Sequence, residues 1–240
     1  MRGTRFEDVV GLLFGGFFAD LPSDAALTRA LGEARARVFA RRAAIDPALL
    51  ALPPTEATRA LMARLADGDD LETALDLIAA PAVFAPMLIR LRRKLEPVAP
   101  DPALGHAADI LYMLRGVSPQ PAEVAALNTY LITVSDHGLN ASTFAARVIA
   151  STRAGLTSSV LAALSALKGP LHGGAPGPVL DALDSIGAPE NAEAWLENAL
   201  DHGERLMGFG HRVYRVRDPR ADALKGAVRG LAAAGTITTK

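Results

Sequence analysis

The stretch TSSVLAALSALK, residues 157–168, is the clearest indicator of the fold class of this chain. Its apolar residues recur at helical spacing from Val160 to Leu167, and Thr157 is the predicted N-cap. Gly169 and Pro170 follow directly and are expected to end the helix. The many Ala and Ser residues between them would let this helix pack closely against others.

The same pattern recurs along the whole chain. In SPQPAEVAALNTYLITVSDH (118–137), Ser118 is the predicted N-cap and Pro119 the first helical residue. We find no run of alternating β-branched residues and no Asn-Gly hairpin signal. The sequence therefore predicts an all-α fold. Further helical patterns cover roughly 6–17, 23–44, 55–66, 70–79, 84–95, 102–115, 141–151, 176–186, 190–202 and 218–233.

Composition narrows the class of protein. The chain has 240 residues, enough for one large or two small domains, and half of them are apolar. With 25 basic and 26 acidic residues, the net charge of −1 indicates no binding of nucleic acid or of an anionic membrane. The absence of cysteine rules out disulfides, thiolate catalysis and Cys-ligated metals, and it fits a cytoplasmic protein.

The N-terminal stretch VVGLLFGGFFA (9–19) is the strongest candidate for a membrane or export signal. Its eleven residues are too few to span a bilayer. Glu7 and Asp8 lie directly before it, where an export signal needs positive charge. We therefore expect an amphipathic helix at the N-terminus of a soluble protein with no membrane partner.

The stretch LKGPLHGGAP (167–176) holds one histidine, His172, between glycines. Glycines beside an imidazole let a backbone or a ligand come close, because no Cβ intervenes. The same residues would also suit a plain helix end. From these residues alone, a catalytic site and a simple turn both remain open.

Two other histidines lie in comparable surroundings. His137 ends one predicted helix in SDHGLNASTFAARV (135–148), and Asn140 is expected to cap the next. His211 follows a Gly-Phe-Gly turn in LMGFGHRVYRVRDPRA (206–221). Guanidinium groups suit carboxylates or phosphates in bidentate geometry. The five arginines near His211 are Arg205, Arg212, Arg215, Arg217 and Arg220.

The remaining histidines and motifs point to no other chemistry. His106 is predicted to start a packed helix and His202 to lie in a C-terminal turn, both without a chemical role. The spacing of His137, His172 and His211 matches no compact metal-ligand motif, so no metal is predicted. The residues indicate a His/Arg pocket for a small anionic substrate.

Three motifs in order resemble the citrate synthase family. They are DHGLNASTF (136–144), LKGPLHGGAP (167–176) and MGFGHRVYRVRDPRA (207–221), at fitting distances. RFEDVVGLL and LYMLRG are also similar to the large domain of that family. The resemblance implies an all-helical homodimer. The large domain would span residues 1–174, without its leading segment, and residues 175–240 would form part of a smaller domain that closes over the substrates.

The resemblance also implies roles for particular residues. The expected reaction condenses acetyl-CoA with oxaloacetate to citrate and CoA, with no permanently bound cofactor. His172 would hydrogen-bond the thioester carbonyl, and His211 would polarise and protonate the oxaloacetate ketone. His137 and Arg220 would bind oxaloacetate. The turn that would meet the adenine of coenzyme A consists of Met207, Gly208, Phe209 and Gly210.

The sequence departs from the family after His211, where the only acidic residues are Asp218 and Asp222. The proton-abstracting aspartate of the family lies further downstream, so the chain is expected to be truncated at its C-terminus. A missing base should cripple turnover, because general-base catalysis contributes roughly 10²–10⁴-fold. The alternatives are a fragment or short paralogue that binds coenzyme A or a dicarboxylate, and a 2-methylcitrate synthase that uses propionyl-CoA.

Overall fold

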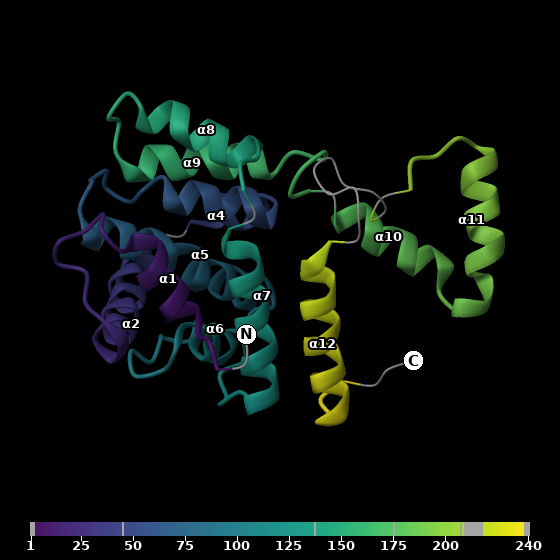
Figure 1. Ribbon diagram of the computed structural model, residues 1–240, viewed down its shortest axis with the longest axis horizontal. Helices are drawn as coiled ribbons and strands as arrows, with labels where there is room; N and C mark the ends of the chain where they lie inside the picture. The colour runs from purple at the N-terminus through teal and green to yellow at the C-terminus, as the bar shows by residue number, and fades with distance from the viewer. Residues whose placement is uncertain are drawn as a thin grey trace.

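The computed structural model describes residues 3–44, 46–136, 138–174, 176–206, 208 and 218–237. Every regular element in these ranges is a helix, so the prediction of an all-α fold is confirmed (Figure 1). The elements are α1 (Phe6–Phe14), α2 (Asp24–Ala40), η1 (Arg41–Ala44), α3 (Pro47–Ala51), α4 (Pro54–Met62), α5 (Leu71–Arg92), α6 (His106–Arg115), α7 (Pro121–Ser135), α8 (Ala141–Ala150), α9 (Leu156–Leu167), α10 (Pro176–Ile186), η2 (Pro189–Asn191), α11 (Ala192–Asp201) and α12 (Pro219–Ala233).

Helix α5 forms the centre of the core and contacts α2, α4, α6 and α9. The prediction of two helices, 70–79 and 84–95, was wrong, because α5 continues through Pro81 and Pro86. A proline inside a helix removes one backbone hydrogen bond and normally breaks or kinks the helix. Here Val83 and Phe84 are almost fully buried, so packing along the helix outweighs that local cost.

Of the helices in the described ranges, α5 alone is long and apolar enough to suit a membrane crossing by length and composition. Its best 18-residue window has a mean hydropathy of 1.7, and 67% of that window is buried against the other helices. This burial is what a core helix of a folded domain shows. The stretch 9–19, in contrast, forms the end of the nine-residue helix α1 and the turn that follows it.

Arg35 of α2 is the largest side chain buried in the core, with no exposed surface. Its Nε donates to Asp109 Oδ2 over 2.5 Å, and its Nη2 donates to the Leu104 carbonyl over 2.7 Å. Its Nη1 lies 3.2 Å from His106 Nδ1. Each of the three guanidinium nitrogens therefore has a polar partner. These partners offset the free energy that it costs to bury the charge.

The same cluster fastens the N-terminal helix to α6. Glu7 of α1 is buried, and its Oε1 accepts a hydrogen bond from the His106 backbone N–H over 2.7 Å. The ring of Phe6 stacks on the His106 ring with centroids 4.8 Å apart. The prediction that His106 starts a packed helix is confirmed. The burial of Arg35 and Asp109 was not predicted, because their partners are about 70 residues apart.

Acid is expected to destabilise the fold through His106. Burial and the nearby Arg35 charge lower the pKa of His106 from 6.5 to about 3. Because the folded-state pKa is depressed, the unfolded chain binds the proton first between pH 6.5 and 3, and stability falls as pH falls through this window. Between pH 7 and 4.5 the contribution of His106 to this loss should be about 2–3 kcal/mol, measured by urea unfolding of wild type and of a variant without this histidine at both pH values.

His106→Gln provides the matched comparison, because it keeps an acceptor for Arg35 but cannot titrate. Burial raises the pKa of Asp109, and a raised carboxyl pKa gives a contribution of opposite sign that wild type and variant share. The exposed His202 at the end of α11 supplies the control His202→Gln. An equal loss of stability on acidification in wild type and His106→Gln would contradict the prediction.

The helix boundaries around the predicted site follow the sequence with two corrections. Asn140 caps α8 as predicted, since its side chain accepts from the Thr143 N–H over 3.0 Å. Helix α7, however, begins at Pro121 after Gln120 rather than at Pro119, because the Gln120 N–H bonds the Glu123 side chain. Thr157 is not an N-cap, since α9 already begins at Leu156 and Gly155 is its N-cap residue.

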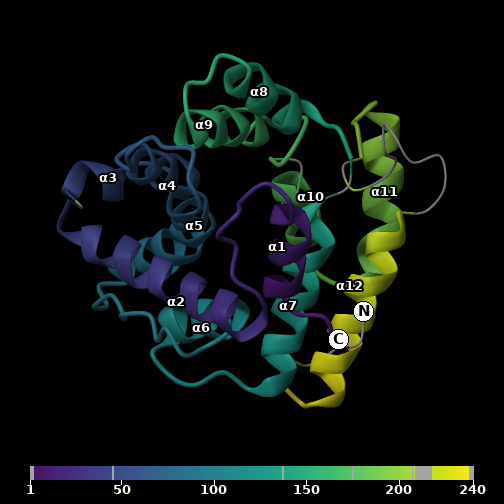
Figure 2. The same cartoon turned by 60° about the vertical axis from the view of Figure 1, so that its left-hand side comes forward.

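Helices α10 and α11 project from the other helices, whereas α12 returns to lie beside α7 (Figure 1). Figure 2 shows the same neighbours from another side, with the two ends of the described chain close to α7 and α12. Helix α12 therefore joins the helical body, although it belongs to the segment predicted as the second domain. The boundary at residue 174 stays a prediction.

Candidate functional site

His172 lies in a tight turn directly after α9. The Gly169 carbonyl accepts from both the His172 N–H (3.0 Å) and the Gly174 N–H (3.1 Å). A Cβ at Gly173 would lie 2.5 Å from Leu167 Cδ1 and 2.6 Å from the Leu167 carbonyl oxygen. Only glycine fits there, so the glycines of LHGGAP fold the turn back onto the end of α9.

The His172 ring meets the first turn of α8. Its Nε2 lies 2.8 Å from Ser142 Oγ, and both side chains are half-buried. Two predicted motifs 30 residues apart therefore come into contact. The sequence predicts only a cap for this segment, at Asn140, and no chemical role for Ser142, because its contact with His172 depends on the packing of α8 against α9.

This pair can fix the protonation pattern of the ring. If the Ser142 hydroxyl donates to Nε2, a neutral imidazole carries its proton on Nδ1, and the Nδ1–H is then a hydrogen-bond donor. A donor of this kind, held by a hydrogen-bonded turn and a second side chain, is suited to stabilise negative charge on a carbonyl oxygen.

Arg220 lies in the first turn of α12. Its Nε is 3.0 Å from both carboxylate oxygens of Asp218, and its Nη2 donates to Asp218 Oδ2 over 2.6 Å. Asp218 also caps the helix, since it accepts from the Arg220 backbone N–H over 2.9 Å. This guanidinium therefore already has the geometry that grips a carboxylate.

Several predicted site residues lie outside the described residues, namely His137, His211, Met207, Phe209 and Gly210. Gly208 is described and has a φ of +90°, which favours glycine. A Cβ there would lie 3.1 Å from Val179 Cγ2 of α10. The described residues hold no group of three His, Asp or Glu that could bind a metal ion, which leaves His137 and His211 untested.

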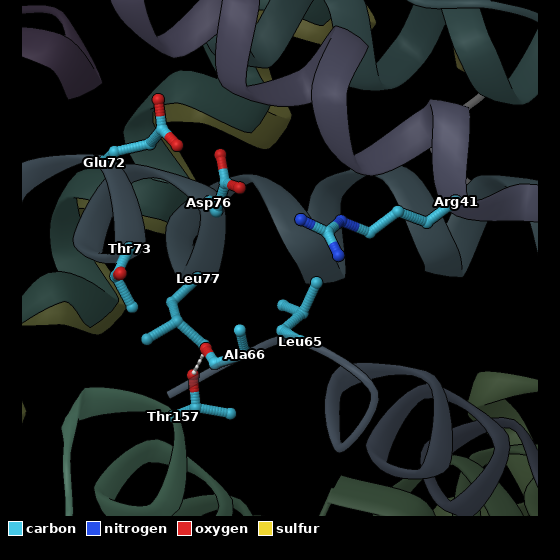
Figure 3. Close-up of a pocket in the computed structure, with 8 residues that line it drawn as sticks. All are labelled: Arg41, Leu65, Ala66, Glu72, Thr73, Asp76, Leu77 and Thr157. Carbon is cyan, nitrogen blue, oxygen red and sulfur yellow. Dashed lines mark hydrogen bonds between the residues drawn. The ribbon is translucent and has the colours of Figure 1, made fainter. Parts of the chain in front are cut away.

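Two hollows on the described part of the surface do not include His172. The first, of about 90 Å³, lies between Arg41, Asp76 and Thr157 (Figure 3). The second, of about 370 Å³, lies on α8 beside Phe144, Arg147 and Val148. The first is far too small for an acyl-CoA, whose binding sites are normally hundreds of Å³. The second is lined by Leu139, Phe144, Arg147, Val148 and Ser151, with no histidine or carboxylate for acid–base chemistry. The catalytic candidate is therefore the His172–Ser142 pair rather than either hollow.

The described elements are all helices, and the candidate site centres on His172 in the glycine turn after α9. Together they define an all-α protein with a histidine-centred site. The chain belongs to the citrate synthase family. Residues 1–239 match the family model described as citrate synthase, C-terminal domain. The family is one of synthase enzymes.

The 2-methylcitrate synthase of Mycobacterium tuberculosis is 39% identical over 248 residues, which cover 97% of this chain and 60% of that protein. The citrate synthase of Mycolicibacterium smegmatis is 38% identical, covering 95% of this chain and 63% of that one. A solved ternary complex of Thermoplasma acidophilum citrate synthase with carboxymethyl coenzyme A and oxaloacetate superposes with a TM-score of 0.78, at 28% identity, over 98% of this chain and 64% of that one. The chain thus spans about 60% of the length of the relatives it matches.

Proposed function

We propose that this chain carries the substrate site of an enzyme that condenses an acyl-CoA with oxaloacetate. The observation that carries the proposal is the His172–Ser142 pair on a glycine-framed turn, in a chain of the citrate synthase family. Acetyl-CoA is the proposed acyl donor and citrate the product. Propionyl-CoA is the alternative, because the relatives include both citrate synthases and 2-methylcitrate synthases.

In this proposal His172 acts on the acyl-CoA. With Ser142 donating to Nε2, the ring presents Nδ1–H to the thioester carbonyl and stabilises the enolate that forms when the methyl proton leaves. The tight turn through Gly169 holds the ring in place, so little reorganisation is needed during the reaction.

The remaining roles rest on the motifs of the family. His211 would polarise and protonate the ketone of oxaloacetate, and His137 would bind the same substrate. Arg220 would bind its carboxylate, a group of the same class as the Asp218 carboxylate that its Nε and Nη2 contact. The turn 207–210 would meet the adenine of coenzyme A.

We also propose that the base that removes the methyl proton is not among these 240 residues. Only Asp218 and Asp222 follow His211. Asp218 is committed to capping α12 and to Arg220, and Asp222 lies in the first turn of the same helix. The missing carboxylate would come from the rest of a longer protein or from a second chain.

A cytoplasmic homodimer without nucleic-acid or membrane partners is the proposed state.

The test is oxaloacetate-dependent release of free coenzyme A thiol by the purified chain, with acetyl-CoA and propionyl-CoA compared. We expect slow thiol release that requires both substrates. Its rate should be roughly 10²–10⁴-fold below that of a complete enzyme, because a general base contributes that factor. Release that does not depend on oxaloacetate would contradict the condensation.

Calorimetry separates the enzyme from a binding module. If no thiol is released, uptake of oxaloacetate that is weakened by Arg220→Ala would support the alternative of a binding fragment. Neither release nor uptake would contradict both functions.

A further inference from the structure

Helix α9, which delivers His172, is capped by a segment far away in the sequence. Its own N-cap residue is Gly155, which has a φ of +101° and no side chain to bond the first N–H groups. Asp67, in the turn after α4, supplies that bond. The Ser158 N–H donates to Asp67 Oδ1 over 3.1 Å, and the Ser158 hydroxyl donates to Oδ2 over 2.5 Å.

Two more hydrogen bonds join the same turn to the start of α9. The Leu156 N–H donates to the Gly68 carbonyl over 2.8 Å, and the buried Thr157 hydroxyl donates to the Ala66 carbonyl over 2.9 Å (Figure 3). Hydrogen bonds from Ser158 lower the pKa of Asp67, in keeping with an ionised cap.

Gly155 is what allows Asp67 to approach. A Cβ at Gly155 would lie 2.3 Å from Asp67 Oδ1 and 2.6 Å from its Cγ. No side chain can occupy that space while the carboxylate is in place. Gly155 therefore accounts for both features: it provides no local side-chain cap for α9, and it leaves room for Asp67 to cap the helix from a distant segment.

The other end of α9 also contacts the α4 segment. Lys168 Nζ lies 2.7 Å from Glu56 Oε1 in the first turn of α4. The two contacts are a helix length apart, about 18 Å for twelve residues. Both groups of this pair are partly exposed, so it contributes little energy, whereas four hydrogen bonds hold the start of α9 to residues 66–68.

Helices α8 and α9 form a hairpin that carries both His172 and Ser142. Helix α8 lies outermost and packs mainly on α9, while α9 packs on α4 and α5 (Figures 1 and 2). Leu156, Val160 and Leu164 of α9 cover the core. Apolar burial of this kind is not directional, so the axial position of α9 depends more on the hydrogen bonds at its start, which come from Asp67, Gly68 and Ala66.

We propose that Asp67 is a positioning residue for His172: by capping α9 from the loop after α4, it sets the axial position of the α8–α9 hairpin. His172 and Ser142 move together with this hairpin, so their mutual contact does not depend on Asp67. What Asp67 fixes is the distance of the pair from residues carried by the helical body. The catalytic consequence rests on the function proposed above, whereas the geometric consequence does not.

The geometric test attaches spin labels to introduced cysteines, which is specific because the chain has no cysteine of its own. Spin labels on Ala150→Cys of α8 and Arg29→Cys of α2, both exposed positions, report the distance between hairpin and body. We expect Asp67→Ala to shift or broaden this distance distribution. Asp67→Asn should have a smaller effect, because it keeps an acceptor for the Ser158 N–H. Asp69→Ala is the matched control, an exposed acid in the same turn for which no hydrogen bond is seen among the described residues.

The kinetic test is the split between kcat and KM. Asp67→Ala should lower kcat on the order of tenfold, because small misplacements of a catalytic group are costly, and should leave the KM for oxaloacetate within about twofold. Asp67→Asn should restore part of the rate. Ser158→Ala, which removes only the hydroxyl bond, serves if Asp67→Ala does not fold.

The outcomes distinguish this inference from the proposed function. A shifted distance in a chain without condensation activity would uphold the positioning and overturn the function. An unchanged distance in Asp67→Ala and in Ser158→Ala would overturn the positioning, whatever the activity. Equal effects of Asp67→Ala and Asp69→Ala would overturn it as well.

Discussion

Replacing His172 by alanine is expected to lower oxaloacetate-dependent thiol release by about 10²–10³-fold relative to the unsubstituted chain. The reason is the loss of a pre-positioned hydrogen-bond donor to the developing enolate oxygen, since the turn through Gly169 and the Ser142 hydroxyl hold the ring in place. The fold should survive, because the ring is only half-buried and makes one side-chain hydrogen bond among the described contacts. Initial rates with saturating acyl-CoA, with circular dichroism as a check of folding, provide the measurement.

Ser142→Ala is the informative companion variant. It leaves the ring in its turn but removes the partner that selects the proton position, so we expect a smaller loss, on the order of tenfold. In the His172→Ala background the same change should have almost no further effect, because the two side chains act as one unit. Independent, multiplying effects of the two substitutions would contradict the proposed pairing.

Replacing Arg35 by methionine is expected to lower the free energy of unfolding by about 3–5 kcal/mol. The substitution fills similar volume but leaves the Asp109 carboxylate buried without its cation. It also leaves the Leu104 carbonyl without a donor. Urea denaturation monitored by circular dichroism at pH 7 measures the change.

Arg115→Met is the matched control, because Arg115 pairs with Glu123 at the surface with 43% of its side chain exposed. Exposed ion pairs contribute little, so the control should lose no more than about 1 kcal/mol. The double variant Arg35→Met with Asp109→Leu should recover part of the lost stability, because it removes the stranded charge. Similar losses in the two single methionine variants would show that the buried cluster is not what holds α2 to α6.

Local sequence signals predicted the helices best where the signal and its partner lie close together. Asn140 caps α8 because its side chain reaches an N–H three residues away. The stop at Gly169 and Pro170 likewise depends on neighbours within one turn. Pro81 and Pro86 were misleading, since burial of α5 overrides the local cost of a proline within a helix.

For the site, the motifs identified His172 but not what surrounds it. The residue types and their order were enough to indicate the citrate synthase family, which the comparison with the family model confirmed. The pairing with Ser142 and the remote cap from Asp67 could not be predicted from the sequence, because each joins residues 30 or 91 positions apart. The roles of His137 and His211 stay predictions.

The sequence by itself determined the helical class, the glycine turn that carries His172, and the family. These properties depend on periodicity, on caps and on the freedom of glycine, all of which act over a few residues. Only the tertiary structure decided that Arg35 is buried between Asp109 and His106, and that α9 is capped by Asp67 rather than by Thr157. The physical reason is that hydrogen bonds and desolvation at these sites depend on which distant segments the packed core brings together.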